Sequence, residues 1–337
     1  MSKNKTIIIA EAGVNHNGNI KIAKKLVDVA KISGADYVKF QTFKTENFVC
    51  KNAKTVKYQM KYVKKKQTQF NLLKKLEFSQ TNHKKIIQYC KRKKISYISS
   101  PFDLESLNLL FRLKIFDIKV ASGEINNYIF LRNLAKKAKK IFISSGMSTL
   151  NEVSQAIKIL ITNGAKKKNI TFLHCHTDYP TQLSDVNLFA METMKKKFNI
   201  NVGYSDHTTG SETAVAAVAL GAKVIEKHIT LNKNMRGPDH KASMEPKNFF
   251  NYVKLIRNTE ILLGSHLKKP SKSELKNKKL VRKSIVAKKN IKRGEIFSED
   301  NLICKRPEGG ISPINWNSVM GKKSKRNFRT DDFISLK

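Results

Sequence analysis

Short apolar segments recur along most of the chain, and amphipathic stretches separate them. Several are nearly continuous runs of Ile, Val, Phe and Tyr, which is typical of strands buried on both faces, as in a parallel sheet covered by helices. There are eight such segments: Ile7–Ala10, Tyr37–Thr42, Tyr97–Ser100, Ile115–Ala121, Ile141–Ser144, Ile170–Cys175, Val202–Tyr204 and Val224–Ile229.

The stretches between these segments have helical periodicity. Ile20–Ser33 places Ile22 and Leu26 on one face, and Asn151–Thr162 and Glu212–Leu220 repeat the design, each with a glycine just beyond its end. Strand followed by helix eight times predicts a (β/α)₈ TIM barrel. An open doubly wound sheet is the alternative, but no GxGxxG sequence follows the first segment.

Composition shifts divide the chain into parts of unequal size. We expect a catalytic barrel over residues 1–263, a charged linker over 264–280 and a small β-rich module over 281–337. Within the barrel, Thr45–Leu76 belongs to an interval too long for an ordinary connection. We expect it to extend over the barrel mouth, where long loops usually serve binding.

The net charge is +40, from 66 Lys and Arg against 26 Asp and Glu. Such a balance can indicate a nucleic-acid or anionic membrane partner. The lysines are spread through all predicted elements without interleaved aromatic residues, however, so we expect neither partner. The four cysteines have no CxxC spacing, and no apolar segment has signal-peptide or transmembrane length. A cytoplasmic location is the simplest expectation.

Chemically active side chains gather at the predicted carboxyl ends of the strands, where a parallel barrel has its active site. One group can bind an anion: Lys39 and Lys119 supply positive charge, among the hydroxyl donors Ser100, Ser122, Ser144 and Ser205. A single lysine at a strand end usually extends into solvent. Two lysines among several serines around one rim favour phosphate binding.

A second group can bind a metal ion. His207 and His228 end successive predicted strands, so their imidazoles can converge, although a lone histidine is more often structural. Two neutral imidazoles with open coordination positions suit Mn²⁺, Fe²⁺ or Zn²⁺. Glu11, Glu124 and Glu226 are candidates for proton transfer or for binding substrate hydroxyls, but each could instead pair with a lysine.

Seven segments resemble, in order, the motifs of N-acetylneuraminate synthase and its relatives, which make sialic-acid-like nonulosonates. They are Ala10–Gly18 (AEAGVNHNG), Val38–Gln41 (VKFQ), Ser99–Phe102 (SSPF), Lys119–Glu124 (KVASGE), Ser144–Met147 (SSGM), Tyr204–Thr208 (YSDHT) and Glu226–His228 (EKH). The C-terminal part, through Lys305–Pro307, resembles the antifreeze-like (SAF) domain of those enzymes, so the resemblance covers essentially the whole chain.

The resemblance implies that phosphoenolpyruvate binds to Lys39, Ser100, Lys119, Ser122, Ser144 and Ser205. It also implies that His207 and His228 hold a divalent metal, usually Mn²⁺ or Mg²⁺, which polarises an open-chain sugar aldehyde for attack by C3 of phosphoenolpyruvate. Water then adds at C2, and phosphate leaves by C–O cleavage. Glu124 would stabilise the cationic centre or orient the water, while Glu11 and Gln41 would contact the sugar or its metal-bound water.

The acceptor sugar is indicated by segments closer to the N,N′-diacetyllegionaminate branch of the family: Leu173–Thr181, Asp185–Leu188 and Gly237–Ser243. In them Tyr179, Asp239 and Thr177, together with Glu226, are expected substrate contacts. Neuraminate synthases usually have Asn where Thr177 stands, which favours another acceptor and leaves the role of Thr177 open. We expect 2,4-diacetamido-2,4,6-trideoxymannose, with N-acetylmannosamine or the pseudaminate precursor as alternatives.

Family members are domain-swapped homodimers, and Arg306 matches the arginine that reaches the partner's sugar N-acyl group. Two readings from other classes stay open. One is a Schiff-base aldolase or lyase that uses Lys119 or Lys227. The other is a nucleic-acid-binding protein, which the charge suggests but which leaves the polar strand ends unexplained.

Overall fold

A computed structural model describes residues 5–54 and 68–337 of the chain. The chain divides into two compact units, the first ending at Gly264 and the second running from Ser265 to Lys337.

The first unit is a closed barrel of eight parallel strands, which confirms the predicted fold. Each strand pairs with the next one in the sequence, and β1 pairs with β8 to close the ring. The strands are β1 (Ile7–Gly13), β2 (Tyr37–Thr42), β3 (Ser96–Pro101), β4 (Asp117–Val120), β5 (Lys140–Ser144), β6 (Ile170–His174), β7 (Asn201–Asp206) and β8 (Val224–His228).

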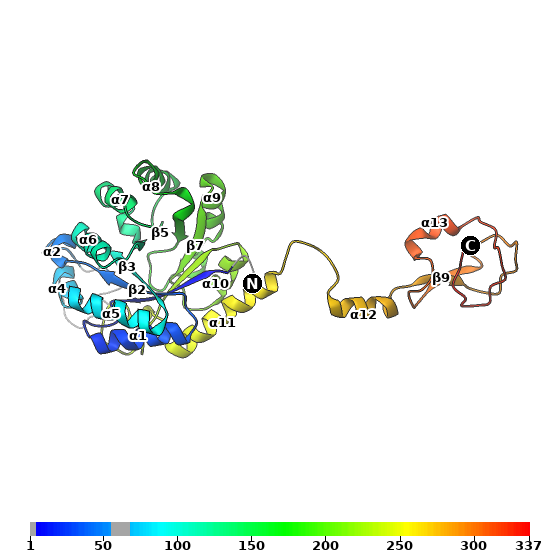
Figure 1. Cartoon of the computed structure of the whole chain (residues 1–337), viewed down its shortest axis with the longest axis horizontal. Helices are drawn as coiled ribbons and strands as arrows, with labels where there is room; N and C mark the ends of the chain where they lie inside the picture. The colour runs from blue at the N-terminus through cyan, green and yellow to red at the C-terminus, as the bar shows by residue number, and fades with distance from the viewer. Residues whose placement is uncertain (1–4, 55–67) are drawn as a thin grey trace. The chain divides into compact units, whose positions relative to one another are not determined.

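Helices surround the barrel on its outside (Figure 1). They are α1 (Ile20–Ile32), α5 (Gln80–Lys93), α6 (Leu104–Arg112), α7 (Tyr128–Ala135), α8 (Leu150–Thr162), α9 (Phe189–Phe198), α10 (Glu212–Ala219) and α11 (Pro246–Leu263). In α1 the side chain of Asn19 caps the first turn, and Ala23, Leu26 and Val27 are buried against the strands. None of the helices that the structure describes is long and apolar enough to span a lipid bilayer.

The inside of the barrel is apolar at the amino ends of the strands. One buried layer contains Ile9, Tyr37, Ile98, Phe142, Leu173 and Val224. Side chains of a strand alternate between its two faces, so the residues two positions further along point into the same interior. Those residues include Glu11, Lys39, Ser100, Ser144, Cys175 and Glu226. The barrel therefore has a solid floor, and the polar side chains lie on top of it.

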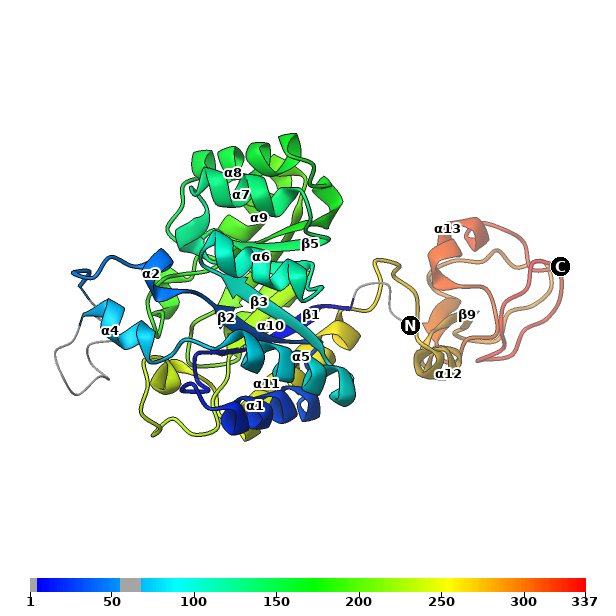
Figure 2. The same ribbon diagram turned by 60° about the vertical axis from the view of Figure 1, so that its left-hand side comes forward.

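The long interval after β2 contains two short helices, α2 (Thr45–Phe48) and α4 (Gln69–Lys74), which lie together at one side of the barrel (Figure 2). Phe48, Phe43 and Phe102 pack against one another there. The extension predicted for Thr45–Leu76 is thus described at both ends, while residues 55–67 fall outside the described residues.

The second unit has a small apolar core of its own, built around Ile285, Phe297 and Phe328. Its strands β9 (Ser284–Ala287) and β10 (Leu302–Lys305) are antiparallel, and the short helix α13 spans Trp316–Val319. The segment predicted as a linker also contains a helix, α12 (Lys272–Val281). Sequence analysis did not anticipate α12, whose residues are all outside the core; a capping box between Ser271 and Glu274 starts it.

Candidate active site

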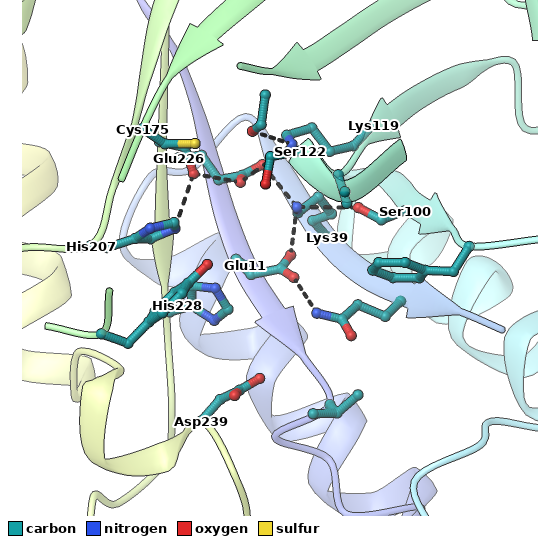
Figure 3. Close-up of a pocket in the computed structure, with 18 of the residues that line it drawn as sticks. Glu11, Lys39, Ser100, Lys119, Ser122, Cys175, His207, Glu226, His228 and Asp239 are labelled. Atoms are coloured by element: carbon teal, nitrogen blue, oxygen red, sulfur yellow. Dashed lines mark hydrogen bonds and ion pairs between the residues drawn. The ribbon is translucent and has the colours of Figure 1, made fainter. Parts of the chain in front are cut away.

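A cavity of about 330 Å³ opens at the carboxyl ends of the strands, above the apolar floor (Figure 3). Thirteen of the sixteen candidate residues line it: Glu11, Lys39, Gln41, Ser100, Lys119, Ser122, Ser144, Tyr179, Ser205, His207, Glu226, His228 and Asp239. Parallel pairing brings them together, since the strand registers set Glu11 beside Lys39 and His228. A β-bulge between Glu11 and Gly13 changes the direction of β1 at the rim of the cavity.

Buried lysines and carboxylates form a connected cluster at the bottom of the cavity. The ammonium of Lys39 lies 3.0 Å from Glu226 Oε2 and 3.4 Å from Glu11 Oε2. The ammonium of Lys119 lies 4.0 Å from Glu226 Oε1 and donates to Ser144 Oγ at 2.6 Å. Glu226 is therefore shared between the two lysines, as Figure 3 shows.

The cluster shifts the proton affinities of its members. Burial alone would raise the pKa of Glu226, but Lys119 and Lys39 outweigh it and lower that pKa to about 2. Burial raises the pKa of Glu11 to about 7, against the opposing charge of Lys39. Burial also lowers the pKa of Lys119 to about 8. Near neutral pH the cavity thus holds a carboxylate between two ammonium groups, with Glu11 able to exchange a proton.

The two histidines form the opposite wall, with ring centroids 5.8 Å apart. Nδ1 of His207 is hydrogen-bonded to the carbonyl oxygen of His176, which leaves Nε2 as the acceptor nitrogen. Nδ1 of His228 is buried without a hydrogen-bond partner among the described residues. Burial lowers the pKa of His207 to about 4 and that of His228 well below its usual range. Both imidazoles are therefore neutral, the form that binds metals.

Two neutral imidazoles at this spacing fit a divalent metal with most of its coordination positions open. Among the described residues, no group of three or more His, Cys, Asp and Glu side chains is placed to hold a metal ion, so a metal here would have these two imidazoles as its protein ligands. Open positions are a property of catalytic rather than structural metal sites. The hydrogen bond from His207 to a carbonyl is the usual way in which a ligating histidine is oriented.

The remaining wall residues provide hydrogen-bonding and ring surfaces. Tyr179 stacks on His207 with a centroid distance of 4.1 Å. Gln41 donates to Glu11 at 3.3 Å. Ser205 donates to Glu226 at 2.8 Å, which leaves its own oxygen facing His207 at 3.4 Å. Asp239 comes from the loop after β8, and burial raises its pKa to about 6.

Three candidate residues do not line the cavity. Glu124 lies just after Ser122, where its carboxylate accepts a hydrogen bond from Asn127 at 2.7 Å. Thr177 lies on the loop after β6, and its methyl group would be 3.4 Å from a side chain built on Gly146. Arg306 belongs to the second unit, where it is exposed. The roles expected for these residues stay predictions.

Three further side chains near the strand ends differ in whether they line the cavity. His174 points out of the barrel and bonds to the carbonyl oxygen of Val186 at 2.8 Å, whereas Cys175 lines the cavity. Cys175 was missed as a site residue, although its position two residues after Leu173 puts it on the inner face. Lys227, one of the two lysines considered for a Schiff base, lines a different hollow and is not a wall residue of this cavity.

Phe48, Gln69 and Leu73 add part of the α2–α4 region to the cavity wall. The sequence predicted that this region would lie over the barrel mouth, but the composition of the long interval did not single out these three residues. Their place follows from the packing of α2 and α4 on Phe102, which no local pattern reveals.

Comparison with known proteins identifies relatives of the whole chain. Residues 26–268 match the NeuB family and residues 282–337 match the SAF domain. The N,N′-diacetyllegionaminic acid synthase of Campylobacter jejuni is 50% identical over 98% of this chain and 99% of its own length. The enzyme of the same name from Legionella pneumophila is 42% identical over 95% of this chain and 90% of its own length.

A solved structure gives the same result for the fold. The N-acetylneuraminic acid (sialic acid) synthetase of Leptospira borgpetersenii superposes with a TM-score of 0.71 at 31% identity, covering 81% of this chain and 90% of that one. The family resemblance that the sequence motifs carried is confirmed by these matches. The barrel, its polar rim and the C-terminal SAF domain together make this chain a member of the NeuB family.

Proposed function

We propose that this enzyme condenses phosphoenolpyruvate with 2,4-diacetamido-2,4,6-trideoxymannose to give N,N′-diacetyllegionaminate and phosphate. The observation that carries the proposal is the cavity in which two buried lysines and four serines face a pair of neutral histidines. The names of the two relatives at 50% and 42% identity support the choice of product.

The lysine cluster suits a small dianionic or trianionic substrate. Lys39 and Lys119 both lie close to the carboxylate of Glu226. An anion that binds beside this carboxylate is therefore near two ammonium groups at once. Ser100 and Ser144, which are hydrogen-bonded to these ammonium groups, and Ser122 beside them can donate to phosphate or carboxylate oxygens. Phosphoenolpyruvate carries both kinds of anion on one three-carbon unit, which matches two cationic groups in one small cavity.

The overall reaction forms a bond between C3 of phosphoenolpyruvate and the aldehyde carbon of the sugar. Water adds to C2, and the bond from C2 to the phosphate oxygen breaks. A divalent ion such as Mn²⁺ or Mg²⁺ at His207 and His228 would supply Lewis-acid polarisation of a carbonyl oxygen. Glu11, whose pKa lies near 7, can take the proton that the added water loses. Lys39 and Lys119 stabilise the charge on the departing phosphate.

The sugar would lie between the histidines and the outer wall of the cavity. Gln41, Tyr179 and Asp239 line the cavity, and their side chains can hydrogen-bond the hydroxyl and amide groups of the sugar. Glu124 and Thr177 do not line the cavity, and their expected roles toward the water and the substrate stay predictions. N-acetylmannosamine and the pseudaminate precursor are the alternative acceptors.

One assay tests the proposal directly. Phosphate release from phosphoenolpyruvate is measured with Mn²⁺ across a panel of N-acyl sugars that includes all three acceptors. The diacetamido sugar should give the highest kcat/KM. Preference for another panel sugar would change the acceptor, and no phosphate release with any of them would remove the proposed reaction.

A Schiff-base lyase is the second candidate, because the lowered pKa of Lys119 makes its amine more nucleophilic. Its ammonium is already held by Ser144 and the carbonyl oxygen of Val120, which favours a binding role. Borohydride treatment with pyruvate separates the two functions. A covalent adduct on Lys119 would support the lyase, while unmodified protein supports the condensation.

We further propose a cytoplasmic homodimer in which Arg306 of one subunit completes the sugar site of the other. The resemblance to domain-swapped relatives supports this arrangement, and mixing two impaired variants at a sugar concentration below the wild-type KM tests it. An Arg306→Ala subunit keeps an intact barrel, and a His228→Ala subunit keeps an intact Arg306. Mixed dimers should regain part of the activity; inactive mixtures with proven subunit exchange would contradict the swap.

A further inference from the structure

Two of the family-like segments contain conspicuous residues that the catalytic cavity does not use. In YSDHT and EKH, Asp206 and Lys227 stand directly beside His207 and His228, yet neither lines the cavity. Side chains alternate between the two faces of a strand. Ser205 and His207 face inward, as do Glu226 and His228, so Asp206 and Lys227 face outward. Lys227 lines a separate hollow of about 200 Å³ on the other side of the strands.

Asp206 and Lys227 form a deeply buried ion pair. Oδ2 of Asp206 lies 3.0 Å from the ammonium of Lys227, and the two side chains are 0% and 2% exposed. The same oxygen accepts a hydrogen bond from the hydroxyl of Tyr252 at 2.8 Å. Its other oxygen accepts from the backbone N–H and the hydroxyl of Thr208, at 2.9 and 2.7 Å. Both oxygens of the buried carboxylate are thus fully used.

This network joins the two segments that carry the histidines. Asp206 and Lys227 are register partners on the neighbouring strands β7 and β8. Each directly precedes one of the two histidines in the sequence. The ammonium of Lys227 also donates to the carbonyl oxygen of Thr208, the residue after His207. The network therefore includes the residues on both sides of His207, Asp206 and Thr208. It also includes Lys227, the residue that precedes His228.

A helix anchors the network from outside. Tyr252 is fully buried on α11, and its hydroxyl reaches across to Asp206. The His207 ring has a separate contact, in which its Nδ1 is hydrogen-bonded to the carbonyl oxygen of His176. Between these contacts the ring of His207 has little freedom to change its position relative to His228.

We propose that Asp206, Lys227 and Tyr252 are positioning residues that set the distance and orientation of the two histidines for a divalent cation. The proposal rests on the metal role given to these histidines under the proposed function. An ion pair used only for stability could lie anywhere in the barrel, and buried pairs are weak stabilisers because both charges lose their hydration. Its place directly before both histidines is accounted for by positioning, since groups that orient ligating histidines commonly change metal affinity by about 10–100-fold.

The first test measures Mn²⁺ binding to the full-length protein without substrates, by electron paramagnetic resonance of free Mn²⁺. Asp206→Asn keeps the shape of the side chain but removes its charge, and should weaken Mn²⁺ binding by about tenfold or more. Tyr252→Phe removes one hydrogen bond only and should weaken it by a smaller factor. Phosphoenolpyruvate binding in the absence of metal should change little, because Lys39 and Lys119 belong to the other face of the strands.

The same helix offers a matched control. Arg257 on α11 lies 2.9 Å from Asp36, in a partly buried ion pair that precedes β2 at the amino ends of the strands. Asp36→Asn should lower thermal stability without changing Mn²⁺ affinity, and His228→Ala should abolish Mn²⁺ binding. If His228→Ala still binds Mn²⁺ normally, the metal assignment itself fails.

Mn²⁺ affinity within twofold of wild type in both Asp206→Asn and Tyr252→Phe would overturn the positioning role while leaving the metal assignment intact. Should Asp206→Asn not fold, Tyr252→Phe alone decides. If the variants that fold lose stability to the same extent as Asp36→Asn but keep their Mn²⁺ affinity, the network is structural.

Discussion

Replacing Glu226 with glutamine removes the carboxylate that lies between the two lysines of the catalytic cavity. Lys39 is 6% exposed and Lys119 is 2% exposed, so neither can turn to solvent; Lys39 keeps Glu11 at 3.4 Å, whereas Lys119 loses its carboxylate partner. Leaving a buried charge without its partner costs about 3–5 kcal/mol. The lowered pKa of Glu226, about 2 against its usual 4.5, gives a similar value of about 3 kcal/mol for the stabilisation of its ionised form.

We therefore expect Glu226→Gln to lower the melting temperature by about 6–10 °C, at about 2 °C for each kcal/mol in a domain of this size. Inorganic phosphate or phosphoenolpyruvate should recover much of the loss. In the wild type an entering anion competes with Glu226 for both ammonium groups, whereas in the variant Lys119 has lost its carboxylate partner and Lys39 keeps only Glu11. Ligand binding to the folded state raises stability according to its affinity, so the thermal shift caused by anions should be larger in the variant.

Thermal unfolding followed by circular dichroism, with and without each anion, measures both effects. Glu260→Gln is the control, because that carboxylate accepts hydrogen bonds from the backbone of Thr6 and from Arg257, outside the cavity. It should be destabilised without any enhanced response to anions. A Glu226→Gln protein with wild-type melting temperature, or one that anions stabilise no more than wild type, would refute the electrostatic reasoning.

Three further predictions concern the metal, the second unit and pH. His207→Ala and His228→Ala should each abolish metal-dependent turnover while circular dichroism stays unchanged; activity retained in either would remove the metal assignment. Arg306→Ala should raise the KM for the sugar more than that for phosphoenolpyruvate, and an unchanged sugar KM in steady-state kinetics would count against a role in sugar binding. Burial lowers the pKa of His83 to about 3 and that of His16 to about 4, from 6.5, so both bind protons more readily when unfolded. Stability should fall as pH drops below 6.5, by about 4 kcal/mol for the pair at about pH 5; urea unfolding that shows no loss between pH 7 and 5 would contradict this.

The order of strands and helices could be predicted from the sequence because every strand is buried on both faces and therefore reads as an apolar run. The ends of the strands were harder to predict than their order. β1 was expected to stop at Ala10, but it continues to Gly13, since Glu11 stays paired with Lys39 while its side chain enters the cavity. A polar residue inside a strand looks like the end of that strand when only hydropathy is considered.

Most of the site follows from one further rule, the alternation of side chains. An apolar residue on the barrel floor fixes the direction of the residue two positions later, and Ile9 to Glu11, Tyr37 to Lys39 and Val224 to Glu226 obey this rule. The same rule would have selected Cys175 over His174, because Leu173 belongs to the floor. The rule does not predict which side chains from different elements contact one another. Examples are the two ion pairs of Glu226 with lysines and the hydrogen bond from Tyr252 to Asp206. Those contacts depend on strand stagger and helix placement, which are set by packing over the whole barrel, and they determine the charge of the cavity and the geometry of its histidines.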